Sequence, residues 1–453
     1  MELRKIMKDQ TGLARNITIL GGGIAGLAVG YYAKKNNVPF TIIEAKDCIG
    51  GNCVTFRYSD FLFDSGAHRL HDKDADATRE LKGLLKENFH EIQVPSRIYH
   101  NGKTIDFPLS PLNLIKSLGL WTSAKALVDV VHSRLTIPKA HGNFERYALH
   151  TYGKTIAECL LLNYSEKLWG ESCHKLSTSI AGKRIKGLTM KTFLFEALFG
   201  QRLKTRHLDG SFYYPASGIG MIVKELGRYC TEKNIWMNSI VTRVMHNNKR
   251  IVAVEVNNKK IVPVEEMVST LPLPLFLEIM EPRPPAHLLS LAGNLRFRHL
   301  ILVVFFLNRK SVTESASIYF PDPSFPFTRI SEPKNRSSLM SPPDKTSLIL
   351  EIPCHQTDAL WTLNDDKLIQ INLSKLVKIG WIGEKEVIQA LVHRISYAYP
   401  LLEIDSEDRI RKIHGFLNRF ENLRLSGRCA QFGYTFIHDS MKSGREIIDE
   451  YLL

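Results

Sequence analysis

Hydrophobic and polar positions fall into distinct blocks along the first fifty residues. An apolar run over 16–20 leads directly into three glycines, 21–23, and a helix-forming stretch follows over 27–35. A second apolar run over 40–43 ends in Glu44. Short apolar runs bounded by turn residues are typical of buried strands, so this block predicts a strand, a tight turn, a helix and a second strand.

A second block of the same kind lies in the middle of the chain. It predicts a helix over 221–233, followed by three strands at 240–245, 251–256 and 261–264. Asn257-Asn258 joins the last two strands and is a hairpin turn signal. The apolar run over 267–272 predicts a strand that returns to the first sheet.

These blocks predict an α/β protein with a discontinuous nucleotide-binding domain. We expect that domain to comprise residues 16–105, 213–272 and 406–453. The residues between these pieces divide into a mostly helical insert, 106–212, and an α+β substrate domain, 273–405, in which strands and helices are mixed.

The glycines of the first turn fit the dinucleotide-binding pattern G-x-G-x-x-G. Gly21 allows the strand-to-helix turn, Gly23 lets a pyrophosphate approach the backbone, and Gly26 lets helix and strand pack closely. The start of the helix faces the phosphates, and Glu44 is placed to accept the ribose hydroxyls. The alternative is a glycine-rich turn in another kind of α/β protein.

A second glycine pair, Gly50-Gly51, follows Glu44 closely. This arrangement resembles flavoproteins of the amine oxidase and protoporphyrinogen oxidase superfamily, whose structural group includes UDP-galactopyranose mutase. The resemblance implies a glutathione-reductase-like, Rossmann-type domain that binds FAD, with NAD as the second alternative. The residues expected at the cofactor from these two motifs are Gly21, Gly23, Ile24, Ala25, Gly26, Glu44, Ala45, Lys46, Gly50, Gly51 and Asn52.

Two segments resemble the parts of this superfamily that lie near flavin and substrate. Residues 63–68 resemble the strand and loop that bring a backbone, and often a histidine, against the flavin ring, which implies that role for His68. Residues 163–170 resemble the Y-T-x-K-x-W-G segment, which implies Tyr164, Trp169 and the later Arg184 at the substrate site. The alternatives are ordinary strand-end hydrogen bonds for His68 and core packing for the two aromatic residues.

A third segment, 327–334, resembles the mutase sequence Y-T-R-I-x-E-x-K. The resemblance implies that Arg329 lies beside the flavin and a substrate diphosphate, and a guanidinium group suits this role because it binds phosphate bidentately and stays charged. The alternative is a surface ion pair. We expect a small-molecule substrate that carries a phosphate or a carboxylate.

The C-terminal piece completes the resemblance. Gly427 and Arg428 match a strand end beside the FAD pyrophosphate, and Tyr434 falls where the mutase has a phosphate-binding tyrosine. The start of the last helix, with Ser440 and Met441, would point its amides at the flavin. Val241 completes the expected cofactor contacts.

Two departures weaken the mutase interpretation: Phe436 replaces an aspartate, and Phe193 and Phe195 occupy the region of a mutase tyrosine.

The composition and net charge limit the kinds of ligand and partner that we expect for this protein. The net charge of +14 would steer anionic substrates or anionic lipid, but the basic residues are spread along the chain and form no recognised nucleic-acid module. The seven cysteines have no metal-ligand spacing, so we expect no metal site. The N-terminus is polar, without a secretory signal, and the longest apolar run, 300–307, is too short to span a bilayer, so we expect a cytoplasmic protein.

One segment, 108–135, could attach the protein weakly to a membrane surface. Its apolar positions Leu112, Ile115, Leu118, Leu127, Val130 and Val131 could form one side, with Lys116, Lys125, His132 and Arg134 toward lipid headgroups and Trp121 at the interface. The alternative is that this apolar stripe packs into the core. The oligomeric state cannot be predicted from the sequence.

Three functions remain open at this stage. The first is an FAD-dependent oxidoreductase that takes a hydride from an anionic small molecule, since the sequence shows no other catalytic motif beside the flavin signature. The second is a mutase-like enzyme that acts on a nucleotide sugar without net redox change. The third is a non-catalytic FAD-binding protein.

Overall fold

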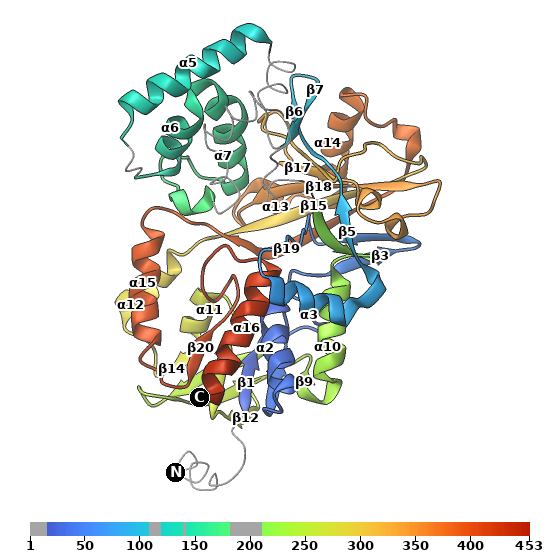
Figure 1. Cartoon of the computed structure of the whole chain (residues 1–453). Helices are drawn as coiled ribbons and strands as arrows, with labels where there is room; N and C mark the ends of the chain where they lie inside the picture. Colours follow the sequence, from blue (N-terminus) through green and yellow to red (C-terminus); the bar gives the residue numbers. More distant parts are fainter. Residues whose placement is uncertain (1–15, 108–118, 139–141, 182–210) are drawn as a thin grey trace.

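A five-stranded parallel sheet forms the lower half of the molecule in Figure 1. The computed structural model describes residues 16–107, 119–138, 142–181 and 211–453. The strands of this sheet, in spatial order, are β20 (Leu423–Leu425), β13 (Glu266–Ser269), β1 (Ile17–Leu20), β2 (Phe40–Ile43) and β9 (Ile235–Trp236). The strand, helix and strand predicted at the start of the chain are confirmed, and the predicted return strand is β13, which pairs parallel to β1.

Helices from both ends and the middle of the chain pack beside this sheet. They are α2 (Ile24–Lys35), α3 (Ala75–Leu85), α10 (Gly220–Cys230) and α16 (Ile437–Leu452). Their apolar side chains form one core with β1 and β2, in which Leu27, Ile42 and Met441 are fully buried. Because α2 and α16 pack against each other, the last helix of the chain lies beside the helix that follows the first glycine loop.

A small four-stranded sheet adjoins this core. Its strands are β12 (Lys260–Pro263), β11 (Ile251–Val256), β10 (Val241–His246) and β14 (Met280–Glu281). Asn257 and Asn258 have φ values of +55° and +54°, so the predicted hairpin turn is confirmed. The helices that share its core are α11 (Leu273–Glu278), α12 (Ala286–Gly293) and α15 (Ser406–Leu417).

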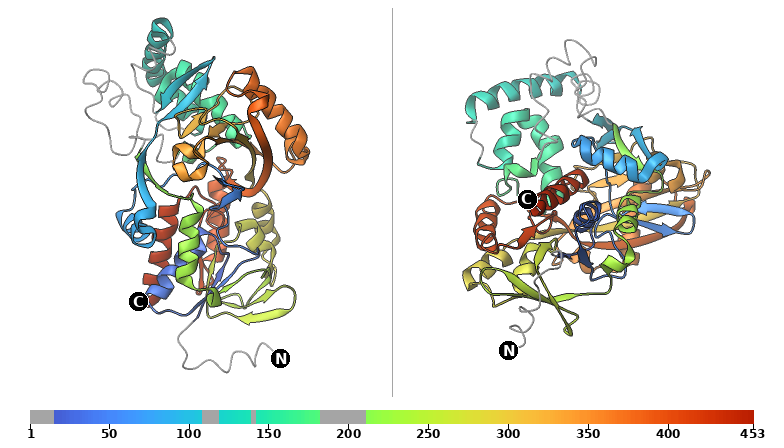
Figure 2. Two further views of the ribbon diagram at one scale, coloured as in Figure 1. Left: turned by 90° about the vertical axis from the view of Figure 1, so that its right-hand side faces the viewer. Right: turned by 60° about the horizontal axis from the view of Figure 1, so that its bottom comes forward.

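A seven-stranded, mostly antiparallel sheet forms the upper half (Figures 1 and 2). Its strands, in spatial order, are β19 (Val387–Pro400), β15 (Phe297–Leu307), β18 (Thr346–Cys354), β17 (Arg329–Ser331), β16 (Ser317–Tyr319), β6 (Ser96–His100) and β7 (Lys103–Phe107). The helices that follow β18 are α13 (Ala359–Thr362) and α14 (Asp365–Lys378).

The apolar run in β15 is long because both faces of this strand are covered. Its odd-numbered residues from Ile301 to Leu307 share a core with Leu368 and Leu376 of α14. Its even-numbered residues pack against the hairpin of β3 (Thr55–Tyr58) and β4 (Phe61–Asp64). A strand that is buried on both faces has a continuous run of hydrophobic residues rather than alternating hydrophobic and polar residues.

A helical region lies beside this sheet at the upper left of Figure 1. It contains α5 (Leu120–Thr136), α6 (Phe144–Ile156), the π-helical segment η2 (Ala157–Leu162) and α7 (Asn163–Trp169). The other elements of the described residues are the strand pair β5 (Phe89–Gln93) and β8 (Ser211–Pro215) and the short 3₁₀ turns η1 (Lys86–Asn88), η3 (Thr178–Ala181), η5 (Glu232–Asn234), η6 (Pro333–Asn335), η7 (Ser338–Met340) and η8 (Glu384–Glu386).

Two segments differ from the expected division of the chain. Residues 96–105 were expected in the nucleotide-binding domain, but β6 and β7 extend the seven-stranded sheet, because Ser96, Arg97 and Ile98 pair with β16. Residues 273–293 were expected in the substrate domain, but α11 and α12 share their core with the small sheet. Elsewhere the domain bounds stay a prediction.

Candidate active site

The turn after β1 requires a glycine at position 21. Its φ is +99°, and a Cβ there would lie 2.3 Å from the Oγ1 of Thr270. A Cβ on Gly26 would lie 2.0 Å from the carbonyl oxygen of Gly21, so the first turn of α2 packs directly on this loop. These are the close contacts that the sequence pattern predicts for the two positions.

Gly23 is different, because the protein leaves room beside it. A Cβ there would meet nothing closer than the Cα of Gly51, at 3.8 Å. The second glycine loop is held in this place by the N–H of Gly50, which donates to the carbonyl of Gly22 at 2.9 Å. Next to this space lie Ile24 and Ala25, which begin α2, and the first amides of a helix have no partner within it. Two glycine loops beside the unpaired first amides of a helix suit the pyrophosphate of FAD, whose charge those amides would face.

Glu44 lies at the end of β2 and is buried. Its carboxylate accepts hydrogen bonds from the N–H of Gly22 at 2.6 Å and of Lys46 at 2.9 Å. The N–H of Ser239 donates to the carbonyl of Glu44, which brings the start of β10, with Val241, alongside it. Ala45 and Lys46 are exposed on the same edge.

The amide of Asn52, on the second glycine loop, turns toward the seven-stranded sheet. It donates to the carbonyls of Ser396 and Tyr397 in β19, at 3.2 and 3.1 Å. Asn52 therefore ties the glycine loop to the other half of the molecule, and its contact with the cofactor stays a prediction.

The C-terminal piece reaches the same loop through Gly427. A Cβ there would lie 2.7 Å from the Cβ of Ala25, at a φ of +86°. The guanidinium of Arg428 donates to the carbonyls of Ala398 at 2.9 Å and Thr435 at 2.8 Å. These bonds brace the loop before α16, and a contact of Arg428 with the pyrophosphate stays a prediction.

Ser440 and Met441 lie in the first turn of α16 and are buried. The Met441 side chain belongs to the core with β1 and α2 rather than to a cavity. Any contact of Met441 with a cofactor would therefore be made by its backbone.

His68 follows β4 and lies among three arginines. Its Nε2 is 3.3 Å from the Oγ of Ser65. Burial, together with the positive charges of Arg428, Arg336 and Arg329, lowers the pKa of His68 to about 3. The imidazole is therefore neutral at physiological pH, in a strongly positive environment.

Arg329 lies in β17 and pairs with the buried carboxylate of Glu351 on the neighbouring strand β18. The other carboxylate oxygen of Glu351 accepts the N–H of Ala67 at 2.8 Å. Burial alone would lower the pKa of Arg329, but the charge of Glu351 raises that pKa, so the guanidinium stays charged. The alternative of a surface ion pair is wrong for Arg329, since its side chain is only 13% exposed.

Aromatic rings surround this pair. The rings of Tyr164 and Tyr319 meet edge to face at 5.6 Å, and the ring of Tyr399 stacks on that of Tyr434 at 5.9 Å. Trp169 is buried and packs edge-on against both Tyr399 and Tyr434 at 6.2 Å. Burial raises the pKa of Tyr164 and of Tyr399, so both phenols stay protonated.

The structure thus brings His68, Arg329, Tyr434, Tyr164 and Trp169 toward one region. Arg184 lies outside the described residues, as do Phe193 and Phe195. Four further residues of this region were not predicted from the sequence: Glu351, Tyr399, Tyr319 and Arg336. Glu351 is the one acid within the apolar strand 346–354, and this could have indicated a buried ion pair. A carboxylate is costly to bury unless a positive group or hydrogen-bond donors pair with it.

Comparison with known proteins identifies the family. Residues 24–446 match the flavin containing amine oxidoreductases. The chain belongs to this family. It is an oxidoreductase with a mixed α/β fold, and its cofactor is FAD.

Among curated relatives, the coproporphyrinogen III oxidase of Bacillus subtilis is 21% identical over 97% of this chain and 98% of its own length. The mitochondrial protoporphyrinogen oxidase of Nicotiana tabacum is 25% identical, but the matched part covers about a third of that protein, 32%. Among solved structures, a reduced UDP-galactopyranose mutase has a TM-score of 0.85 at 18% identity, covering 97% of this chain and 95% of that one. A putative protoporphyrinogen oxidase from Exiguobacterium has a TM-score of 0.78 at 18% identity, covering 97% and 99%. At these identities the two structures show the fold alone.

No group of three or more His, Cys, Asp or Glu side chains in the described part of the chain could hold a metal ion. No helix within the same residues is long and apolar enough to cross a membrane.

Proposed function

We propose that this flavoprotein oxidises an anionic small molecule, by removal of a hydride from a carbon next to nitrogen or another activating group. FAD, when bound, supplies the hydride acceptor. The residues that would hold it are the glycines of the two loops, Glu44 and the amides at the start of α16.

The main support for an anionic substrate is a hydrogen-bond donor of Arg329 that has no partner among the described residues. One edge of the guanidinium pairs with Glu351, but its Nε is buried and has no hydrogen-bond partner among the described residues. A buried donor without a partner costs about 1–3 kcal/mol, so a ligand oxygen at this atom would be strongly favoured. A carboxylate or phosphate oxygen would provide the shortest and strongest bond.

The other residues of the site position this arginine and exclude water. Glu351 fixes the guanidinium and holds the loop of His68 through the N–H of Ala67. The neutral His68 can donate or accept one hydrogen bond without adding charge. The rings of Tyr164, Tyr399 and Trp169 would keep water from the reacting carbon, which strengthens the electrostatic contacts there.

The test is anaerobic bleaching of the FAD-loaded protein. Porphyrinogens with carboxylate side chains, amines, prenyl phosphates and nucleotide sugars are added in turn, and the flavin absorbance is followed. We expect bleaching by an anionic compound and recovery of colour with air. In the same assay, Arg329→Lys keeps the charge beside Glu351 but loses the forked geometry, so it should weaken substrate binding about tenfold or more, with unchanged FAD content. An uncharged substrate that bleaches the flavin equally in both proteins would contradict the proposal.

A mutase that acts on a nucleotide sugar without net oxidation is the second candidate. The likeness in fold, with a TM-score of 0.85, supports it. The phenylalanine at 436 counts against it, because the mutase has an aspartate there. A mutase would need prior reduction and would consume no electron acceptor, so the bleaching assay separates the two functions.

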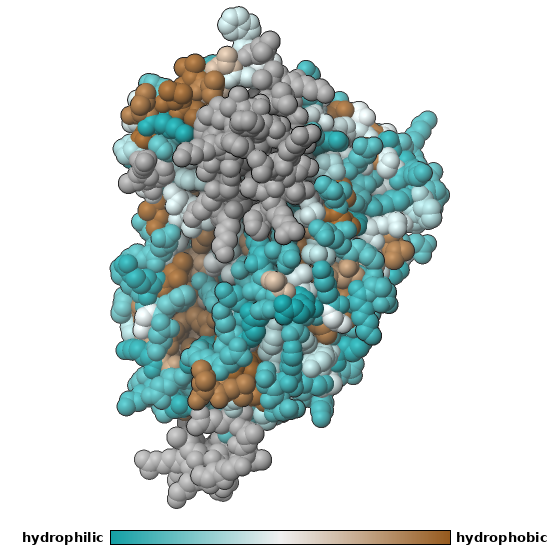
Figure 3. All heavy atoms as spheres, in the orientation of Figure 1, coloured by the Kyte–Doolittle hydropathy of each residue, from teal (hydrophilic) through white to brown (hydrophobic). Residues whose placement is uncertain are grey.

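We also propose that α5 binds weakly to anionic membrane surfaces. Its outward side carries exposed apolar residues at helical spacing, with Trp121 90%, Val128 66%, Val131 55% and Leu135 82% exposed. Figure 3 shows this apolar area at the upper left of the molecule. Lys125, His132 and Arg134 are exposed on the same helix. Of the predicted stripe, Leu127 and Val131 are 47% and 55% exposed, whereas Val130 is buried, as the alternative of core packing requires. Leu112, Ile115, Lys116 and Leu118 lie outside the described residues.

A further inference from the structure

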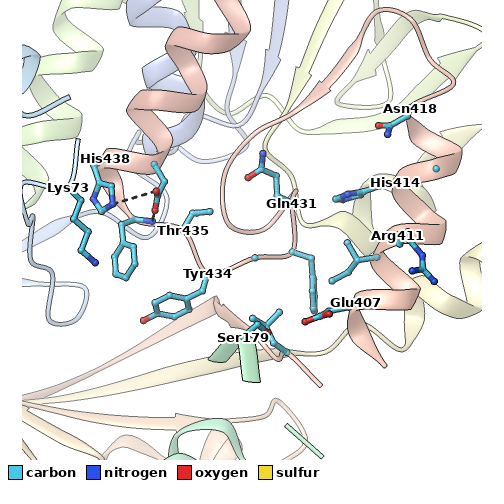
Figure 4. A pocket seen from close by; sticks show the side chains of 17 residues that line it. Lys73, Ser179, Glu407, Arg411, His414, Asn418, Gln431, Tyr434, Thr435 and His438 are labelled. Atoms are coloured by element: carbon cyan, nitrogen blue, oxygen red, sulfur yellow. Dashed lines mark hydrogen bonds and ion pairs between the residues drawn. The ribbon is translucent and has the colours of Figure 1, made fainter. Parts of the chain in front are cut away.

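A cavity of about 870 Å³ lies between α15 and the loop before α16 (Figure 4). One side of α15 forms one wall, and residues 431–436 with the first turn of α16 form the other. Neither the glycines of the two nucleotide loops nor Glu44 lines it. The cavity therefore does not include the glycine loops expected at the FAD pyrophosphate, but it shares the first turn of α16 with the residues proposed to hold FAD.

The α15 wall has a glycine where a helix would be more stable with another residue. Gly415 lies within the helix, and a Cβ there would meet nothing within 4 Å. Glycine within a helix costs roughly 1 kcal/mol relative to alanine. The missing side chain leaves the cavity wider at this point, at some expense of helix stability.

The same wall presents a polar atom without a partner. The Nε2 of His414 is buried and has no hydrogen-bond partner among the described residues. Burial lowers the pKa of His414, so the ring is neutral. A ligand group that exchanges one hydrogen bond with this nitrogen would satisfy it.

Tyr434 lines this cavity and also packs against a ring of the arginine site. In Figure 4 its ring lies between Lys73 and His438 on one side and Arg411 and His414 on the other. The same ring stacks on Tyr399, which lies close enough to Arg329 for the positive charge of Arg329 to act on the pKa of Tyr399. A molecule seated in the cavity would thus contact a wall of the proposed active site.

We propose that this cavity holds the non-reacting body of the substrate, and that the substrate is therefore an elongated organic anion with a large apolar or aromatic body. This inference rests on the proposed function. The volume lies within the 300–1,000 Å³ typical of small-molecule sites, and Leu402, Ile410, Phe432 and Phe436 give the cavity apolar walls. A compact amine would leave most of it filled only by water.

The test uses 8-anilinonaphthalene-1-sulfonate, which has fused aromatic rings and one negative charge, with the full-length FAD-loaded protein. All variants carry Val128→Gln and Val131→Gln, so that the exposed face of α5 does not bind the dye. Gly415→Leu fills the cavity. Gly83→Leu is the matched control, since Gly83 also lies within a helix, α3, and a Cβ there would meet nothing within 4 Å. Dye fluorescence gives the affinity, and a difference spectrum of the flavin bands reports contact with the active site.

We expect one saturable dye site whose occupancy shifts the flavin bands. Gly415→Leu should weaken dye binding tenfold or more, and Gly83→Leu should leave it unchanged. His414→Phe keeps an aromatic ring but removes the ring nitrogen, and it should weaken dye binding two- to fivefold. This variant tests the cavity if Gly415→Leu does not fold. Equal affinity in Gly415→Leu and Gly83→Leu would overturn the proposal, and so would dye binding that leaves the flavin bands unchanged. The proposed function fails in a different measurement, if no anionic compound bleaches the flavin.

Discussion

Glu351 accepts a hydrogen bond from the backbone N–H of Ala67 at 2.8 Å, across the two halves of the molecule. The glutamate lies in the seven-stranded sheet, and the alanine lies in the loop that leads from β4 to His68. Because the same carboxylate also pairs with Arg329, one buried group fixes both the loop of His68 and the arginine proposed to bind substrate.

Replacing Glu351 with Gln should therefore destabilise the protein strongly. The variant keeps the size of the side chain and an acceptor for Ala67, but it leaves Arg329 without its buried counter-charge. Breaking a buried ion pair in this way costs about 3–5 kcal/mol. Urea unfolding of the FAD-loaded protein would measure the loss. Glu450→Gln is the control, because Glu450 pairs with Arg424 on the surface, where such pairs contribute about 0–1 kcal/mol. Equal losses in the two variants would refute the role of Glu351.

Gly23→Val should fold but should not retain FAD. The structure leaves room for a side chain at Gly23, with Gly51 as the nearest neighbour at 3.8 Å, so the fold itself tolerates valine. The same side chain would occupy the space that fits the pyrophosphate. We expect a normal thermal unfolding transition for the apoprotein and at least a tenfold loss of flavin absorbance per chain. Full FAD content in a folded variant would show that the cofactor lies elsewhere.

The parts of this fold that depend on local pattern could be predicted from the sequence. The turn at Gly21 and the hairpin at Asn257 use residues that favour their backbone angles, +99° and +55°, and each sits next to an apolar strand. Glu44 could be placed because it directly follows a strand. These features require only neighbours in the chain.

Apart from the return strand β13, which pairs with β1, the parts that depend on distant pairing could not be predicted. β6 joins the seven-stranded sheet because it pairs with β16, about 220 residues away, and nothing in the local pattern of 96–100 distinguishes that sheet from the first. The pairing of Glu351 with Ala67 spans 284 residues. Tyr399 belongs to the site only because β19 carries it to Arg329, and one tyrosine among fifteen has no local signal.

The pH dependence of stability should carry a contribution from His68. Its pKa is lowered to about 3 in the folded protein, and the ordinary value for an unfolded histidine is about 6.5. Between these values the unfolded chain takes up a proton that the folded protein does not, so stability is lost as the pH falls from 6.5 toward 3. His68→Gln should reduce the slope of unfolding free energy against pH by up to about 1.4 kcal/mol per pH unit between pH 4.5 and 5.5. Urea unfolding of both proteins across this range would measure it, and identical slopes would mean that His68 titrates normally.

The membrane proposal makes a prediction about two valines. Wild-type protein should sediment with vesicles of phosphatidylcholine containing one third phosphatidylserine at low salt, and less at high salt, because part of the attraction is between charges. Val128→Gln with Val131→Gln leaves every charge in place but removes two apolar side chains that would enter the lipid interface. Transfer of two valines is worth about 2–3 kcal/mol, so the vesicle affinity should fall at least tenfold.

The matched control is Ile240→Gln with Ile388→Gln. These isoleucines are 53% and 46% exposed on other parts of the surface, so their replacement changes overall surface hydrophobicity to a similar extent without touching α5. The control should bind vesicles as the wild type does. If both double variants lose affinity equally, the attraction is general rather than a property of α5. A wild-type protein that stays in the supernatant at low salt would leave the exposed face of α5 without a lipid partner.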